Sequence, residues 1–264
     1  MIKAAFIGVG NMGGALAKAA CKSLGGEQVA VSNRTFTKAE ALASKIGCQS
    51  YPSNREAAQK AEYVFLCVKP NQIRGVIEDL GDIWKGKVLI SVAAGVTLAE
   101  LQKWAGEEVP VLRIMPNTPC EIGKGLTALA GGGKAKEEHF AAVEEILSQS
   151  GMVERMEEEM IEPYNAVAGC GPAFVYPYIE ALADGGVLVG LHREEAIRYA
   201  AQMVMGAAAM VLETGEHPGK LKDAVCSPGG LTIEGVAALE RHGLRAAAID
   251  AVVAAWEKGR KYKS

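Results

Sequence analysis

Residues 4–13, Ala-Ala-Phe-Ile-Gly-Val-Gly-Asn-Met-Gly, decide the fold of the first half of this 264-residue chain. An apolar run leads into three glycines with the spacing GxGxxG, and a helical pattern follows. This spacing is common by chance, but between a strand and a helix it is the fingerprint of a dinucleotide-binding turn. Glycines there allow a tight turn, the approach of a pyrophosphate and close helix packing, while the helix N-terminus offers N–H groups to phosphates. We therefore predict a cofactor-binding turn, or alternatively a purely structural one, at Gly8, Gly10, Asn11, Met12 and Gly13.

Outward from this stretch, short apolar runs alternate with helical patterns, which predicts βαβ units around a parallel sheet. The runs are apolar almost throughout, as expected for strands that are covered on both faces. We expect strands at 4–8, 28–32, 63–68, 88–92, 109–114 and 151–155, helices at 13–23, 38–45, 54–59, 73–80, 98–104 and 137–149, and a turn at 131–133.

After about residue 157 the alternation stops, and the helical patterns are at 160–168, 173–189, 193–213, 231–241 and 245–258. The sequence thus predicts an α/β protein in which an N-terminal Rossmann-type parallel-sheet dinucleotide-binding domain (1–157) precedes an all-helical C-terminal domain (158–264). The pattern at 193–213 has an apolar stripe too wide for a solvated surface helix. Either this stripe forms the core of the small domain or it is a subunit interface, and both interpretations stay open.

The composition narrows the functional classes. Hydrophobic residues make up 49% of the chain and charged residues 22%, and the net charge is −3, so no basic face for nucleic acid or an anionic membrane is expected. The six cysteines form no CxxC pair and the four histidines are isolated, which indicates reduced thiols and no metal site. No apolar run approaches the length of a membrane span. We therefore expect a cytoplasmic protein.

The end of the second predicted strand indicates which cofactor is bound. Enzymes that bind NAD place Asp or Glu there to accept the ribose hydroxyls. This chain has Asn33 and Arg34 instead, and an arginine can bind the 2′-phosphate of NADP. NADPH is therefore the predicted cofactor, with NADH left open as a weaker donor; the alternative for Arg34 is a solvated surface side chain.

Three further turns are candidates for ligand contact. Val68-Lys69-Pro70 and Ala93-Ala94-Gly95 follow predicted strands, where ligands of open α/β sheets bind. In the second half, Ser227-Pro228-Gly229-Gly230 precedes an amphipathic helix, which Ser227 is expected to cap. The glycine pair leaves the first N–H groups of that helix open to a small anion such as a carboxylate. An ordinary capped helix start is the alternative.

Together these segments resemble the pyrroline-5-carboxylate reductase family. The matching pieces are FIGVGNMG, VSNR, FLCVKP, SVAAGV, RIMPNTP, GCGPAF, ALADGGV and HPGKLKDAVCSPGGLTIEG, which run in order from residue 6 to about residue 240. The resemblance implies hydride transfer from NADPH to the imine carbon of L-1-pyrroline-5-carboxylate, which gives L-proline. It also implies a homodimer or higher homo-oligomer, built through the helical domain, whose active site is shared by two subunits.

The resemblance assigns roles to individual residues. Ser227, Gly229 and Gly230 would hold the substrate carboxylate, and the Thr232 hydroxyl would bond the ring nitrogen as the catalytic contact. Residues 115–118 would lie near the nicotinamide. The cofactor would be lined by Asn54, Lys69, Pro70, Ala93 and Ala94.

Some residues depart from the family pattern. Leu231, Ala224 and Cys170 stand where the family usually has other residues, which puts the polar substrate contacts in doubt. A 3-hydroxyacid dehydrogenase would need a lysine with a downstream asparagine in the helix at 173–189, which has neither. A reductase of a related cyclic imine would fit the same motifs, and so would a non-catalytic NADP-binding protein on the same fold.

Overall fold

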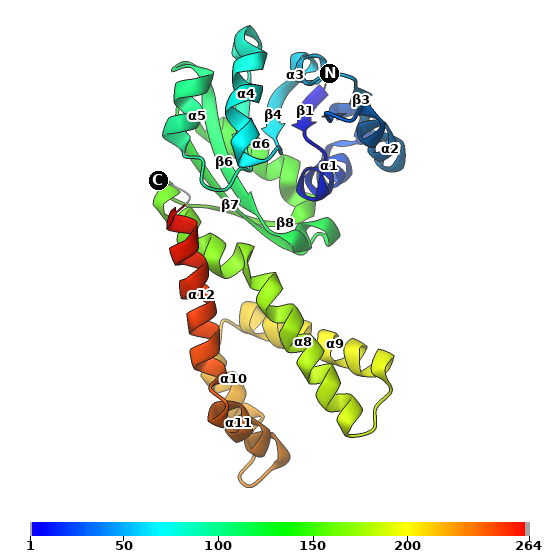
Figure 1. The fold of residues 1–264 in the computed structure, drawn as a ribbon, viewed down its shortest axis with the longest axis vertical. Coiled ribbons are helices and arrows are strands. Elements are labelled where there is room, and N and C mark those ends of the chain that lie inside the picture. Colours follow the sequence, from blue (N-terminus) through cyan, green and yellow to red (C-terminus); the bar gives the residue numbers. More distant parts are fainter. Residues whose placement is uncertain (1, 262–264) are drawn as a thin grey trace. The chain divides into compact units, whose positions relative to one another are not determined.

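The computed structural model describes residues 2–261, which form two compact units. Residues 2–169 together with 256–261 make the first unit, and residues 170–255 make the second (Figure 1). The predicted boundary between residues 157 and 158 falls just after the last strand. In the structure, the first unit continues beyond this point to residue 169. Among residues 2–261, no helix is both long enough and apolar enough to cross a membrane.

The first unit is built on one eight-stranded sheet with the order β3-β2-β1-β4-β5-β6-β7-β8. All neighbouring strands are parallel except β6 and β7, which run antiparallel. The strands are β1 (Ile2–Ile7), β2 (Val29–Ser32), β3 (Gln49–Tyr51), β4 (Ala61–Leu66), β5 (Val88–Ser91), β6 (Pro110–Pro116), β7 (Gly125–Gly133) and β8 (Gly151–Arg155).

Helices cover both faces of this sheet because successive side chains of a strand point to opposite faces. Phe6 of β1 packs in a cluster with residues of α1, α2 and α6, whereas the next residue, Ile7, packs in a cluster with residues of α3, α4 and α5. The helices are α1 (Asn11–Leu24), α2 (Phe36–Ile46), α3 (Asn54–Lys60), α4 (Pro70–Leu80), α5 (Leu98–Ala105), α6 (Glu137–Leu147) and the short α7 (Ile161–Tyr164), after which a π-helical segment (Asn165–Gly169) ends the unit.

The prediction of a turn at 131–133 was wrong. These glycines belong to β7, where Gly131 pairs with Leu112 of β6. A Cβ atom on Gly131 would overlap with the ring of Phe140, so this strand needs glycine because α6 packs directly on it. The sheet is mostly parallel, as predicted, and only β7 runs antiparallel to its neighbour β6. The short strand β3 was not predicted.

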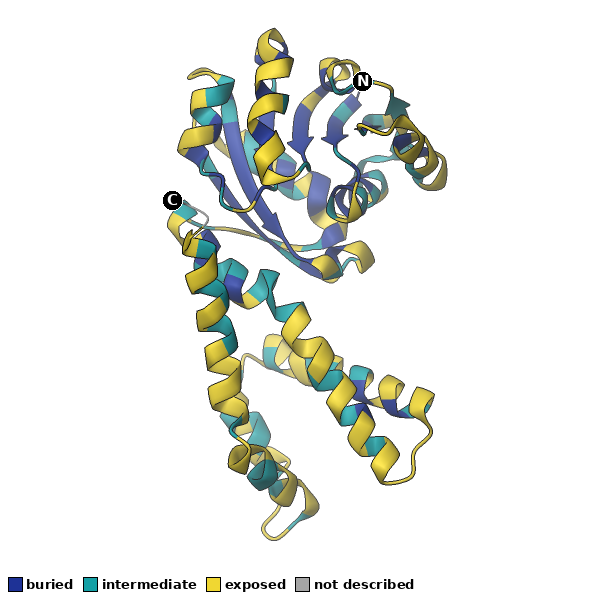
Figure 2. Ribbon diagram, in the orientation of Figure 1, coloured by how far each residue is buried: buried dark blue, intermediate teal, exposed yellow. Residues whose placement is uncertain are grey.

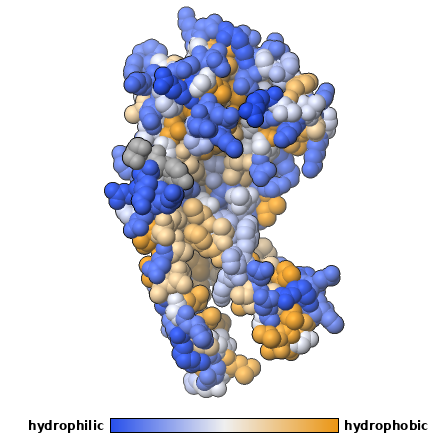
Figure 3. Space-filling view, viewed as in Figure 1, coloured by the Kyte–Doolittle hydropathy of each residue, from blue (hydrophilic) through white to orange (hydrophobic). Residues whose placement is uncertain are grey.

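The second unit contains only helices: α8 (Gly171–Leu188), α9 (Arg193–Thr214), α10 (Pro218–Ala224), α11 (Leu231–Arg241) and most of α12 (Leu244–Arg260). The short α10, capped by the side chain of His217, was not predicted. All residues of 170–255 are described, and only Ala183, Ala196 and Ala200 among them are buried (Figure 2). Many large apolar side chains are exposed instead, and Figure 3 shows apolar surface on these helices.

Candidate active site

A cavity of about 800 Å³ opens at the carboxyl ends of β1, β2 and β4. The backbone keeps these ends together: Gly8 N–H donates to Ser32 O at 2.9 Å and Cys67 N–H donates to Ile7 O at 2.8 Å. Between β1 and β4 the strand order reverses, and open α/β sheets bind ligands at such a point. The lining residues are Gly8, Val9, Gly10, Asn11, Asn33, Arg34, Thr35, Lys38, Pro52, Ser53, Asn54, Cys67, Val68, Lys69, Gln72 and Val76.

The three glycines of the fingerprint have three different surroundings. Gly8 has φ +92°, which favours glycine, and a Cβ there would lie 2.7 Å from Val68 Cγ1. A Cβ on Gly13 would overlap with the carbonyl oxygen of Gly8, so this glycine lets α1 pack on β1. A Cβ on Gly10 would meet nothing within 4 Å. The space at Gly10 is therefore left for a ligand, which fits a bound pyrophosphate.

The N-terminus of α1 faces the same space. Its N-cap residue, Gly10, provides no side-chain cap, and the first turn contains no acidic residue. The first N–H groups of a helix have no partner inside the helix and carry partial positive charge. This end of α1 is therefore suited to bind phosphate oxygens, with Asn11 beside it in the cavity wall.

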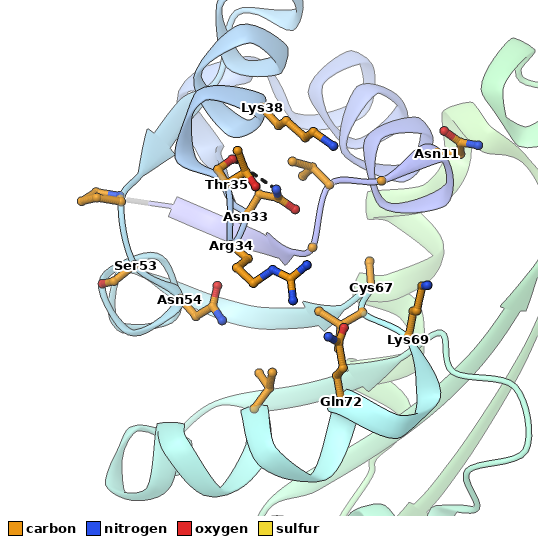
Figure 4. A pocket seen from close by; sticks show the side chains of 16 residues that line it. Asn11, Asn33, Arg34, Thr35, Lys38, Ser53, Asn54, Cys67, Lys69 and Gln72 are labelled. Atoms are coloured by element: carbon orange, nitrogen blue, oxygen red, sulfur yellow. Dashed lines mark hydrogen bonds between the residues drawn. The ribbon is translucent and has the colours of Figure 1, made fainter.

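All charged side chains among the described residues of the cavity wall are basic. Arg34, Lys38 and Lys69 line it, and none of the described lining residues is acidic. Figure 4 shows Arg34 and Gln72 reaching into the cavity from opposite walls. Burial raises the pKa of the Cys67 thiol to about 12, so this group is neutral near pH 7. The wall thus favours an anionic ligand.

Two amide side chains are oriented by their hydrogen bonds. Asn54 Oδ1 accepts a hydrogen bond from Ser32 Oγ at 2.9 Å, which leaves Asn54 Nδ2 as a donor toward the cavity (Figure 4). Asn33 Nδ2 donates to Thr35 O at 3.2 Å, which leaves Asn33 Oδ1 as an acceptor. The cavity therefore offers both kinds of polar contact beside Arg34.

Sequence reasoning singled out only part of this wall. Gln72 and Val76 line the cavity from one face of α4, whereas Ile73 and Ile77 of the same helix are buried. The alternation of exposed and buried positions at helical spacing marks α4 as a surface helix, but it does not say that its exposed face borders a ligand site. That the exposed face of α4 borders the cavity becomes visible only from the position of α4 in the structure.

Several predicted cofactor residues lie outside the cavity wall. Met12 packs beside Cys120, whose thiol donates to the Met12 sulfur at 3.6 Å, and Pro70 is the first residue of α4. Ala93 and Ala94 follow β5, where Ala93 N–H donates to Ser91 Oγ at 3.2 Å. Their contact with a cofactor, like that of Gly13, stays a prediction.

The region 115–118 at the end of β6 is fixed by Asn117. This side chain is nearly buried; its Nδ2 donates to Ala168 O at 3.0 Å and its Oδ1 accepts from Leu126 N–H at 2.9 Å. The loop after β6 is thus tied both to β7 and to the π-helical segment. Its position near a nicotinamide stays a prediction.

The predicted substrate residues lie in the second unit, at the beginning of α11. Gly230, not Ser227, is the N-cap residue of α11, so the predicted Ser227 cap was wrong. Gly230 N–H donates to Ser227 O at 3.0 Å, which closes a turn, and Gly229 takes φ +66° inside it. Thr232 is the second residue of the helix and is exposed. The turn and the start of α11 are accessible to a ligand, but the binding of a ligand there stays a prediction.

Known proteins match this chain over nearly its whole length. Residues 158–262 match the family "Pyrroline-5-carboxylate reductase dimerisation", and residues 3–95 match "NADP oxidoreductase coenzyme F420-dependent". The pyrroline-5-carboxylate reductase of Escherichia coli (strain K12) is 43% identical over 98% of this chain and 97% of its own length. The chain belongs to the pyrroline-5-carboxylate reductase family.

Solved structures of this family have the same fold as the chain. The pyrroline carboxylate reductase of Plasmodium falciparum, solved with NADP bound, has a TM-score of 0.90 at 30% identity and covers 100% of this chain and 98% of its own. The enzyme of Coxiella burnetii has a TM-score of 0.91 at 33% identity, with 100% and 99% coverage. The predictions of the family and of a Rossmann-type domain followed by an all-helical domain are confirmed.

Proposed function

We propose that this protein reduces L-1-pyrroline-5-carboxylate to L-proline with NADPH, the last step of proline biosynthesis. One observation carries the cofactor half of the proposal: the cavity beside the glycine turn is lined by Arg34, Lys38 and Lys69 and by no described acidic residue. Full-length similarity to pyrroline-5-carboxylate reductases supports the substrate.

Within the cofactor site, Arg34 and Lys38 are proposed to bind the 2′-phosphate, and Asn33 and Asn54 to hydrogen-bond the adjoining ribose. A guanidinium forms charge-assisted hydrogen bonds with a phosphate, which a ribose hydroxyl cannot replace. NADH is therefore expected to be a weaker donor. The proposed pyrophosphate turn consists of Gly8, Gly10, Asn11, Met12 and Gly13. On the nicotinamide side the proposed contacts are Val68 and Lys69 in the cavity wall and Pro70, Ala93 and Ala94 beyond it.

Bound NADPH supplies the hydride that reduces the imine carbon of the substrate. The turn at Ser227, Gly229 and Gly230 is proposed to hold the carboxylate at the open N-terminus of α11. The Thr232 hydroxyl then hydrogen-bonds the ring nitrogen, which keeps its proton and becomes a secondary amine when the carbon accepts hydride. A protonated imine needs no strong protein acid, so positioning provides most of the catalysis.

The helical half (158–264) is proposed to carry both substrate binding and homodimer or higher assembly, and residues 1–157 to carry the cofactor. The exposed apolar side chains of α8, α9 and α11 support assembly with further copies, because such surface is unfavourable in water. A cytoplasmic location is part of the proposal and rests on the free cysteines.

The test is the loss of NADPH absorbance with purified protein and L-pyrroline-5-carboxylate, repeated with NADH. Substrate-dependent oxidation that is faster with NADPH supports both reaction and cofactor. Equal use of NADH would contradict the role of Arg34 but not the reaction. No oxidation by folded protein that binds NADPH would point to a related cyclic imine or to a non-catalytic protein.

A further inference from the structure

The guanidinium of Arg113 is completely buried in the first unit. Arg113 lies within β6, where it pairs with Ser91 of β5 on one side and with Ala130 of β7 on the other. Val111 and Met115 of β6 pack on the sheet face that α3, α4 and α5 cover, so the side chain of Arg113 lies on this face too. The proposed reaction makes no use of this charged group.

Two carboxylates meet the guanidinium of Arg113. Its Nη2 lies 2.8 Å from Glu162 Oε1, and its Nη1 lies 3.3 Å from Glu158 Oε1. Glu162 is buried as well, with 7% of its side chain exposed. Glu158 Oε1 also accepts the N–H of Leu98, the first residue of α5, at 2.7 Å. The positive end of α5 therefore helps to balance the second carboxylate.

Both carboxylates belong to the segment through which the chain leaves the first unit. This first crossing, residues 158–169, follows β8 and ends at the boundary between the units. Tyr164 Oη donates to Leu126 O of β7 at 2.6 Å, and Asn117 Nδ2 donates to Ala168 O at 3.0 Å. The residues of the first crossing that are tied to β6, to β7 or to the loop between them are Glu158, Glu162, Tyr164 and Ala168.

The segment through which the chain returns to the first unit reaches the same carboxylate. This second crossing, residues 256–261, includes the last turn of α12. A Cβ atom on Gly259 would lie 3.5 Å from Glu162 Oε2, which is ordinary van der Waals contact. The backbone of α12 therefore packs directly on Glu162. Both crossings thus meet at a carboxylate that Arg113 binds.

This buried ion pair is better suited to fix a position than to add stability. Taking charges out of water is costly, and replacing a buried pair with well-packed apolar side chains is often neutral for stability. Arg113 Nε–H has no acceptor among the described residues, which adds to the cost. A planar guanidinium, however, binds carboxylates only along fixed directions. It can therefore determine where the bound segment lies on the sheet.

We propose that Arg113 is a positioning residue, which acts through Glu162 to hold both crossings in one place on the sheet. The chain joins the second unit to the first only through these crossings, so their movement also moves the proposed substrate residues. Neither Arg113 nor Glu162 lines the cofactor cavity. Loss of the pair should therefore lower turnover and leave cofactor binding intact. The effect on turnover rests on the proposed function, whereas the anchoring of the crossings does not.

The experiment replaces the whole pair, because removing one partner would leave the other charge buried without it. In Arg113→Met/Glu162→Leu, Glu158 keeps the N–H of Leu98, so we expect a folded protein that unfolds near the wild-type temperature. Hydrogen–deuterium exchange with mass spectrometry should show faster exchange in residues 158–169 and 256–261, but not in β1 or α1. With L-pyrroline-5-carboxylate, kcat should fall by about 10- to 100-fold, and the dissociation constant of NADPH should stay within about twofold.

The matched control is Arg155→Met/Glu144→Leu. Arg155 also binds two carboxylates, those of Glu137 and Glu144, but it is exposed and joins β8 to α6. This control should keep the wild-type kcat and the wild-type exchange in both crossings. A milder variant, Glu162→Gln, keeps an oxygen acceptor for Arg113 and should show smaller changes of the same kind. It provides the test if the double variant does not fold.

The proposal is overturned if the folded variants exchange in both crossings as slowly as the wild type. It is also overturned if the crossings exchange faster while kcat is unchanged, or if NADPH binding is lost, because Arg113 would then act on the cofactor site instead. The exchange measurement decides whether Arg113 anchors the crossings even if the wild-type protein does not reduce this substrate.

Discussion

The two units differ in how much of their apolar surface they bury. The first unit buries strand and helix side chains on both faces of its sheet, and all described residues that line its cavity belong to this unit. The second unit buries three alanines and exposes large apolar side chains on most of its helices. We therefore expect the first unit to hold its ligand within one chain, and we expect a further copy to cover the apolar surface of the second unit.

The largest effect is expected from a charge on the apolar surface of α9. Ile197 is 46% exposed in the single chain, and Ile197→Asp would bury an unpaired carboxylate in an interface. We expect the dissociation constant of the oligomer to rise by about 1,000-fold or more, because such burial costs several kcal/mol. Sedimentation over a dilution series measures this, with Gln202→Asp on the same helix as the charge-matched control.

Activity should fall with the oligomer of Ile197→Asp, while NADPH binding should persist because the first unit supplies it. If the Ile197→Asp protein sediments like the wild type, this apolar surface of α9 is not covered by a further copy, and the proposed difference between the two units is contradicted.

A second test addresses the completeness of the cavity in the first unit. Gly10 has φ −76° and open space around it, so Gly10→Asp should fold normally and provide a favourable cap for α1. The carboxylate would, however, stand where the pyrophosphate binds, and we expect NADPH affinity to fall by about 100-fold or more. Fluorescence titration measures the affinity, and Gly10→Ala separates the effect of bulk from that of charge.

If Gly10→Asp unfolds at the wild-type temperature or above and yet binds NADPH with wild-type affinity, the pyrophosphate does not lie at this turn.

Arg34→Ala should lower the affinity for NADPH by about 10- to 100-fold, which corresponds to the loss of one or two charge-assisted hydrogen bonds. The KM for NADH should hardly change, since NADH has no 2′-phosphate. Initial rates with both cofactors measure the difference, and Lys69→Ala is the control for a general loss of positive charge. Equal losses for both cofactors would remove Arg34 from 2′-phosphate recognition.

The smallest effect is expected in the second unit. Thr232→Val keeps the shape of the side chain but removes one hydrogen bond to the substrate, so kcat should fall by about tenfold. NADPH affinity should stay unchanged, and Thr232→Ser should retain most of the activity. Loss of NADPH binding in Thr232→Val would place this residue at the cofactor instead.

The sequence predicted most of the first unit because its signals are local. The strand before Gly8, the positive φ of Gly8 and the helix after Gly10 are each determined by residues that are close together in the sequence. Glycines at 131–133 misled the prediction, because the reason for Gly131 is the ring of Phe140, which is distant packing.

Cavity residues on α4 were missed for the same reason, since their place in the wall depends on which elements lie side by side. In the second unit the four longer helices were predicted and the short α10 was missed. Ser227 was expected to cap α11, but Gly230 is its N-cap residue. The site itself could be approached there only through the family resemblance, because a glycine turn before a helix is also an ordinary structural feature.

The most direct test of the contrast between the units is subunit complementation. Gly10→Asp removes the cofactor half of a site and Thr232→Val weakens the substrate half, so the two variants are dissociated, mixed and reassembled, and NADPH oxidation is measured. If two subunits share each site, the mixture should recover turnover above that of either variant alone. A mixture whose rate equals the average of the two reassembled parents would show that each chain builds its own complete site.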